Sequence, residues 1–256
     1  MSQTYMRYDD EADSLIAKGY IVFSNNRAPY RGEHDLPVLI RNCDKSADEL
    51  PYSEKRALEH AWDSALAPTY RMLLTAHWVL QNPEVVKGKS VLELAAGAAT
   101  IAIAAARSGA KTSTTIDLDG EELVKRNAAA NGVAEAVTII KGNIFSRDCL
   151  PLIQKADIIS LCGFFIQGVD FRNQNQADRA IQRLLFEQAQ RGATILVCAD
   201  EQAFDSGWNI LTNFGTPIRP NNPPLSLFDP KHPDYADNRI EMFKVTPANV
   251  AGRDFV

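Results

Sequence analysis

Residues that can contact a small polar ligand recur where apolar stretches end in the middle of the chain. The small residues Ala95–Ala99 follow one such stretch and precede a helical pattern. They let a ligand lie against the backbone, and the next helix presents its positive end to a charged group. Asp117, about 20 residues further on, can accept hydrogen bonds from both hydroxyls of a ribose. Asn143 follows a third stretch, and its amide can pair with the edge of an adenine.

Each of these residues also has an ordinary structural explanation. A turn of small residues can simply pack a helix onto a strand, and Asn143 suits a tight turn. Asp117 or, better, Asp119 can cap the first turn of a helix. A single feature of this kind therefore indicates little. Their order and spacing jointly favour a nucleoside cofactor that contacts the segment Ser90–Gly97 and Asp117.

Apolar and amphipathic runs alternate from Gly88 onward, which predicts alternating strands and helices. Strands are expected in KSVLELAAG, KTSTTIDLD, AVTIIKGNIF, ADIISLCGFF and ATILVCAD, and helices in ATIAIAAARSGA, GEELVKRNAAANGV and ADRAIQRLLFEQAQRG. This alternation is typical of an α/β fold with a Rossmann-like, doubly wound, mostly parallel sheet. A last strand, RIEMFKVTP, suits antiparallel addition. Ligands of such sheets bind beyond the carboxyl ends of the strands, where the residues above stand.

The first part of the chain has a different pattern, so we expect two units. Residues 1–80 are expected to form an N-terminal cap on the substrate side, and residues 81–256 the cofactor-binding domain. The cap is predicted to contain short strands at Gly19–Asn25 and Leu36–Asn42. A helical run from Ser53 to about Leu80 follows, and Pro68 is expected to split it into two helices.

The 256 residues have an ordinary globular composition and a formal net charge of -5. A mildly acidic chain is repelled by phosphate backbones, so no nucleic-acid partner is expected. The N-terminus lacks a signal-peptide pattern and no apolar run could span a membrane, so a cytoplasmic protein without membrane attachment is expected. The four cysteines are scattered. His60 and Asp63 are close in sequence, but His77 lies further on and no third ligand stands at a fixed spacing, so no metal site is expected. The oligomeric state is left open.

Two stretches, VLELAAGAATIAIAAARSGA and TTIDLDGEELVKRNAAANGV, resemble the class I S-adenosylmethionine-dependent methyltransferases. Within that class the sequence is most similar to the lysine methyltransferases of the electron-transfer-flavoprotein β-subunit type and to ribosomal-protein methyltransferases. The resemblance extends from about Trp62 to Asp200 and is strongest over Asn82–Val133. It implies a Rossmann-like fold, S-adenosylmethionine (SAM) as the cofactor and methyl transfer as the reaction.

The resemblance also implies which residues bind SAM. Asp117 is expected to hold the ribose, Glu93 to lie near the methionine amino group, and Asn143 or the backbone of Ile144 to meet the adenine. Trp62 stands where relatives place an aromatic residue over the cofactor, although anchoring the N-terminal helix in the core is an equally good explanation. The remaining expected cofactor-binding residues are Ala95, Gly97, Leu118 and Cys162.

Two departures from the relatives bear on the reaction. Ala95 and Ala99 replace two of the usual three glycines, which narrows the space for the cofactor. Cys162–Gln167 replaces the motif Gly-Asp-x-Phe-Tyr of the lysine methyltransferases, so the carboxylate that would orient a lysine is missing. An apolar wall there favours a hydrophobic or planar small molecule over a protein lysine, unless its phenylalanines only pack under the cap. The residues expected to face the substrate are Tyr70, Phe164, Phe165 and Gln167.

We therefore predict an enzyme, a SAM-dependent methyltransferase that acts on a nitrogen, oxygen or carbon nucleophile of a small molecule or a protein. The sulfonium of SAM is already activated, so alignment and the exclusion of water suffice and no catalytic residue is predicted. There are two alternatives. One is a protein of the same fold that has lost methyl transfer and acts as a binding or scaffold subunit. The other is a repurposed SAM-binding cyclase or lyase.

Overall fold

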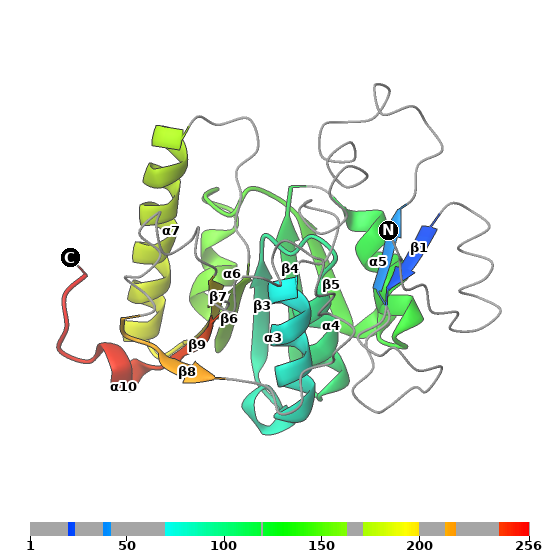
Figure 1. Ribbon diagram of the computed structural model, residues 1–256, viewed down its shortest axis with the longest axis horizontal. Coiled ribbons are helices and arrows are strands. Elements are labelled where there is room, and N and C mark those ends of the chain that lie inside the picture. The colour runs from blue at the N-terminus through cyan, green and yellow to red at the C-terminus, as the bar shows by residue number, and fades with distance from the viewer. Residues whose placement is uncertain are drawn as a thin grey trace, which may run out of the picture.

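One sheet of seven strands forms the centre of the computed structural model (Figure 1), which describes residues 20–23, 38–41, 70–118, 120–162, 171–199, 213–218 and 241–255. The strands are β3 (Ser90–Leu94), β4 (Thr112–Asp117), β5 (Val137–Lys141), β6 (Ile158–Cys162), β7 (Thr194–Ala199), β8 (Thr216–Ile218) and β9 (Glu241–Val245). They lie in the order β5-β4-β3-β6-β7-β9-β8. The first five in this order run parallel, whereas β9 is antiparallel to both of its neighbours, as predicted for the last strand.

Helices cover both faces of the sheet (Figure 1). They are α3 (Tyr70–Gln81), α4 (Thr100–Arg107), α5 (Glu121–Ala130), α6 (Leu150–Lys155), α7 (Phe171–Gln190) and α10 (Pro247–Val250), with short 3-10 helices η2 (Pro83–Val85) and η3 (Ala134–Ala136). None of the helices in these described ranges is long and apolar enough to cross a membrane.

Successive residues of the central strands enter opposite cores. Val91 and Ile158 pack with α3, α4 and α5 on one face, and Leu92 and Ile159 pack with α6 and α7 on the other. Strand β6 is buried at every position, as its continuous apolar run predicts. This alternation is what a doubly wound sheet requires, because side chains of a strand point to its two faces in turn. The predicted α/β fold class is therefore confirmed.

Some element boundaries differ from the sequence predictions. Helix α7 begins at Phe171, before the amphipathic run that starts at Ala177, because neither proline nor glycine interrupts the polar residues between them. The sequence did not predict α6, which has Pro151 in its first turn, or β8, an edge strand that contains Pro217. Such short elements give no periodic signal, and an edge position tolerates the missing N–H of a proline.

The N-terminal region is described at two strands, β1 (Tyr20–Phe23) and β2 (Val38–Arg41), which form a separate antiparallel pair beside α5 (Figure 1). Both lie within the stretches where strands are predicted. Helix α3 lies in the later part of the predicted helical run, and residues 53–69 lie outside the described residues. The predicted boundary between the two units, at residue 80, falls within α3 and remains a prediction.

Candidate cofactor site

The carboxyl ends of β3, β4 and β5 bring the predicted loop, acid and amide to one edge of the sheet. Strand β4 lies between the other two, so Asp117 at its end stands between the loop after β3 and the turn that contains Asn143 after β5. Backbone hydrogen bonds tie these segments together: Ala96 N–H donates to the Ile116 carbonyl at 3.3 Å, and Gly142 N–H donates to the Asp117 carbonyl at 2.8 Å. The parallel topology thus assembles residues that are distant in sequence.

The loop between β3 and α4, Ala95–Ala99, adopts a left-handed backbone at alternate residues. The φ angle is 50° at Ala95, 49° at Gly97 and 58° at Ala99. Glycine adopts these values freely, whereas an alanine is strained there by about 1 kcal/mol or more. These are the three positions at which the resemblance implies glycines. The backbone therefore keeps the conformation that suits glycine although two of the glycines are absent.

Replacing Ala95 or Ala99 by glycine is expected to stabilise the protein. Relief of the left-handed strain exceeds the extra freedom that glycine gives the unfolded chain, so each change should raise the free energy of unfolding by about 0.5–1 kcal/mol. Urea unfolding measures this. Ala96→Gly is the matched control, because Ala96 is in the same loop without a positive φ, and it should destabilise instead. Destabilisation by all three changes would contradict the strained conformation.

Asp117 anchors this loop from the neighbouring strand. Its Oδ2 accepts a hydrogen bond from Gly97 N–H at 2.7 Å, and its Oδ1 accepts one from Leu118 N–H at 2.6 Å. Each carboxylate oxygen can accept more than one hydrogen bond, so these contacts are compatible with additional bonds from the hydroxyls of a ribose. The ribose contact itself remains a prediction.

Glu93 lies beneath the loop, and its carboxyl group caps α4. The side chain is 1% exposed; Oε2 accepts a hydrogen bond from Ala102 N–H at 2.7 Å, and Oε1 accepts one from Ile101 N–H at 3.4 Å. Helix α4 has Ala99 at its N-cap and no capping side chain of its own, so Glu93 supplies the missing acceptors. Burial raises the pKa of Glu93 to about 8, and the charge of Asp117 adds to the rise while the two N–H groups oppose it. Its contact with a methionine amino group stays a prediction.

Three of the predicted cofactor-binding residues lie in the segments that follow β4 and β5. Leu118 is 64% exposed beside Asp117, and Ile144 is buried. Asn143 is exposed, and its Oδ1 accepts a hydrogen bond from Phe145 N–H at 2.9 Å. Asn143 therefore stabilises a tight turn, which is the alternative role predicted for it from the sequence. Its amide nitrogen is not used in that bond, and the adenine contact remains a prediction.

Cys162, at the end of β6, faces α3. Its Sγ lies 3.3 Å from Thr75 Oγ1 and 3.8 Å from Ser160 Oγ. The thiol is 2% exposed, and burial raises its pKa to about 11. A buried neutral thiol is inert as a nucleophile, and the predicted place of Cys162 in the cofactor site remains a prediction. Of the other predicted site residues, Tyr70 begins α3, and Trp62, Phe164, Phe165 and Gln167 lie outside the described residues.

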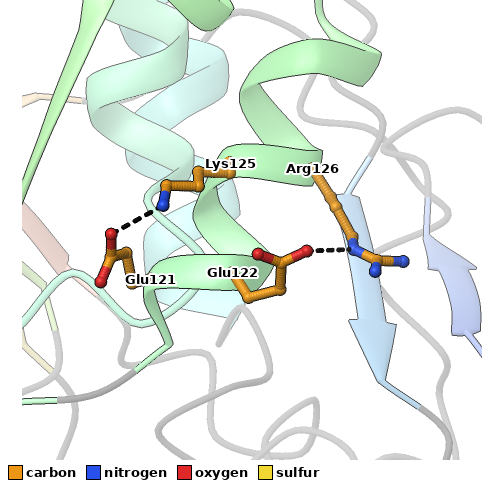
Figure 2. Close-up of polar contacts among 4 residues, drawn as sticks. All are labelled: Glu121, Glu122, Lys125 and Arg126. Atoms are coloured by element: carbon orange, nitrogen blue, oxygen red, sulfur yellow. Dashed lines mark hydrogen bonds and ion pairs between the residues drawn. The ribbon is translucent and has the colours of Figure 1, made fainter.

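Helix α5, which follows Asp117, carries two acidic residues in its first turn. Figure 2 shows that each pairs with a cation one turn along the same helix: Glu121 with Lys125 at 2.7 Å, and Glu122 with Arg126 at 3.0 Å. The hydrogen bond from Lys125 lowers the pKa of Glu121. These carboxylates are exposed and engaged on the helix surface, so they are useful acidic controls for Asp117.

The sequence analysis missed Asn127 as a site residue. Asn127 is fully buried on α5, and its Nδ2 donates a hydrogen bond to the Ala98 carbonyl at 3.0 Å. A signal was present, because helical spacing from the apolar residues Leu123 and Val124 places Asn127 on the inward face. A polar residue on that face needs a buried partner.

Comparisons with known proteins agree with this architecture. A model of the ribosomal protein L11 methyltransferase family (PrmA) matches residues 68–161. The solved structure of SMU.776 complexed with S-adenosyl-L-homocysteine (SAH) matches at 16% identity with a TM-score of 0.50, covering 82% of this chain and 53% of that one. This chain thus spans about half the length of SMU.776. The search of curated proteins gave no match.

The chain has the class I methyltransferase fold. The family match includes the loop, Asp117 and Asn143, and ends in β6. It supports the predicted resemblance to class I methyltransferases, whereas the closer likeness to the electron-transfer-flavoprotein β-subunit enzymes stays a prediction. Two further structures are similar at lower TM-scores. An RNA methyltransferase from Salinibacter ruber with SAH matches at 19% identity with a TM-score of 0.43, covering 70% of this chain and 95% of that one. TrmN from Thermus thermophilus matches at 20% identity with a TM-score of 0.41, covering 59% of this chain and 43% of that one.

The predicted partners were wrong. A small molecule was expected in preference to a protein lysine, with no nucleic acid, but the matching family model is that of an enzyme named for a ribosomal protein. The prediction depended on the summed charge and on an apolar wall at Phe164–Ile166. A net charge of -5 says nothing about a local surface, and that wall lies outside the described residues.

Proposed function

We propose that the protein is a SAM-dependent methyltransferase that transfers the methyl group to a protein. The observation that carries the cofactor assignment is the hydrogen bond between Asp117 and Gly97, and the match to the ribosomal protein L11 methyltransferase family supports a protein as the acceptor. This hydrogen bond holds the acid at the end of β4 and the left-handed loop after β3 together at the carboxyl edge of the sheet. In doubly wound folds this edge is where nucleosides bind.

The described residues fit SAM as the cofactor. Bound SAM supplies a methyl group on a positively charged sulfur. The Asp117 carboxylate offers acceptors for the ribose hydroxyls, and the exposed Leu118 side chain beside it offers an apolar surface for a planar base. SMU.776, which shares the fold, was crystallised with SAH, the form of this cofactor that has lost its methyl group.

The chain's own contribution to the reaction is alignment rather than covalent chemistry. Burial raises the pKa of Cys162 to about 11, so this thiol is expected to stay neutral near pH 7. In the proposed reaction the substrate supplies the nucleophile. The loop and Asp117 fix the position of the nucleoside, and thereby the direction in which the methyl group is presented.

Isothermal titration calorimetry with SAM and SAH tests the cofactor assignment. We expect binding by the wild type, and an affinity at least tenfold lower for Asp117→Ala, because the lost hydrogen bonds to a charged acceptor contribute about 1.5–3 kcal/mol. Glu122→Ala is the matched control, since its carboxylate pairs with Arg126 on the same edge of the fold. No binding by the wild type at millimolar ligand, or equal affinities for Asp117→Ala and wild type, would reject the assignment.

The acceptor is tested with SAM labelled in the methyl group and purified ribosomal subunits as substrate. The proposal predicts label in the protein fraction after separation from RNA, as the match to the ribosomal protein methyltransferase family suggests. Label in RNA would replace the protein acceptor by RNA. SAM binding without transfer to protein, RNA or intact cell extract would favour a scaffold role that has lost methyl transfer.

A further inference from the structure

The loop after β3 is held by a residue that no sequence motif singled out. Asn127 belongs to α5, which begins four residues after the end of β4, and its side chain is 0% exposed. Its Nδ2 donates a hydrogen bond to the Ala98 carbonyl, which is 29 residues earlier in the chain. Ala98 is also 0% exposed, so its carbonyl is out of contact with bulk water. Asn127 therefore links a helix of the outer layer directly to the loop.

An apolar residue would be the ordinary choice at this position. Asparagine is unfavourable inside helices, because its side chain competes with the backbone for hydrogen bonds. Burying its amide also costs free energy unless partners are present. The contact with Ala98 provides such a partner and also satisfies a buried carbonyl. The position of Asn127 is thus explained by the loop rather than by the helix.

The geometry of the loop shows what this contact controls. The carbonyl of Ala98 belongs to the peptide plane that precedes Ala99, and rotation of that plane changes the φ angle of Ala99. The N–H of Gly97 belongs to the peptide plane that precedes Gly97, and Asp117 Oδ2 fixes that plane by accepting a hydrogen bond from this N–H at 2.7 Å. Asparagine and aspartate thus fix two alternate peptide planes, each just before a left-handed residue.

We propose that Asn127 is a positioning residue for the cofactor: it keeps Ala99 in the left-handed conformation that the site requires without touching the ligand. This inference rests on the proposed SAM-binding function. An alanine at this position tends to leave the left-handed region, so the clamp matters more here than it would beside a glycine. The clamp acts on the loop before any ligand binds.

The variant Asn127→Ala tests this in the full-length chain, with Asn131→Ala as the matched control. Asn131 is one turn further along, where its side chain contacts Arg107 and the carbonyl of Asn127. Hydrogen exchange without cofactor is expected to accelerate in peptides that cover residues 95–102 for Asn127→Ala only. SAM affinity is expected to fall about tenfold for Asn127→Ala and to stay within twofold for Asn131→Ala, at a temperature where all variants are folded.

Rescue separates positioning from general destabilisation. Adding Ala99→Gly to Asn127→Ala should return the SAM affinity to within about threefold of Ala99→Gly alone, because glycine needs no clamp. If Asn127→Ala does not fold, Asn127→Leu, which fills a similar volume and favours a helix, replaces it. Unchanged exchange in the loop, or equal losses of affinity in Asn127→Ala and Asn131→Ala, would overturn the inference. A wild type that fails to bind SAM would reject the proposed function, while the exchange comparison would still decide the role of Asn127.

Discussion

The wild type is expected to lose much of its stability as the pH rises from about 4.5 to about 8, and replacing Glu93 by glutamine is expected to remove this loss. In the unfolded chain the carboxyl group ionises near its ordinary pKa of 4.5, whereas burial in the folded protein raises the pKa to about 8. Between these values the folded state holds one proton more than the unfolded state. The free energy of unfolding should therefore fall by about 1.4 kcal/mol per pH unit across this window, on the order of 5 kcal/mol in total.

Glutamine is the right replacement because it has the shape of the protonated carboxyl group and cannot ionise. Its Oε1 can still accept a hydrogen bond from a backbone N–H of α4, so the cap is kept in part. We expect Glu93→Gln to be less stable than or equal to the wild type at pH 5 and more stable at pH 8. Urea unfolding at intervals between pH 5 and pH 9 measures both curves.

Glu122→Gln is the control for this comparison. Glu122 is an exposed carboxylate in the first turn of α5 and pairs with Arg126 on the surface, so its loss should leave the slope of stability against pH unchanged. A wild-type stability that does not fall between pH 5 and pH 8, or an equal slope in Glu93→Gln and wild type, would show that Glu93 is ionised in the folded protein at neutral pH.

Glu93 shows how much of the site can be predicted from the sequence. Its place at the end of the first strand follows from the apolar run before it and the small residues after it. That it caps α4 does not follow, because the contact depends on how α4 packs on β3, and no local pattern encodes that packing. Residues that act through backbone contacts across elements, such as Asn127 on Ala98, are missed for the same reason.

The spacing of Gly97 and Asp117 was informative because parallel topology turns order in sequence into neighbourhood in space. The mostly parallel sheet and the antiparallel β9 could be anticipated as well, because long apolar runs that alternate with helical patterns indicate buried strands. The order of the strands in the sheet was not predicted. The substrate could not be predicted from the sequence. Its binding depends on side chains that converge from several loops, and no topology rule says which loop residues will lie together.

Gln182→Met is expected to stabilise the protein by about 2 kcal/mol, which should raise the Tm by several degrees. Gln182 lies on α7 and is 0% exposed, next to Ile181 and near Leu185 and Phe186, which pack on the sheet. Neither its Oε1 nor its Nε2 has a hydrogen-bond partner within the part of the chain that the structure describes. Methionine has nearly the same length and shape, so it fills the space without burying an amide.

A second glutamine on the same helix provides the comparison. Gln190 is exposed, and its Nε2 donates a hydrogen bond to the Arg253 carbonyl at 3.0 Å, which joins α7 to the C-terminal segment. Gln190→Met removes a satisfied bond and is expected to leave stability unchanged or slightly lower. Thermal and urea unfolding of both variants separate the effect of an unpaired buried amide from that of methionine on α7. Destabilisation by Gln182→Met would contradict this prediction, because removing an unpaired amide from the core should not cost stability when methionine fills the same space.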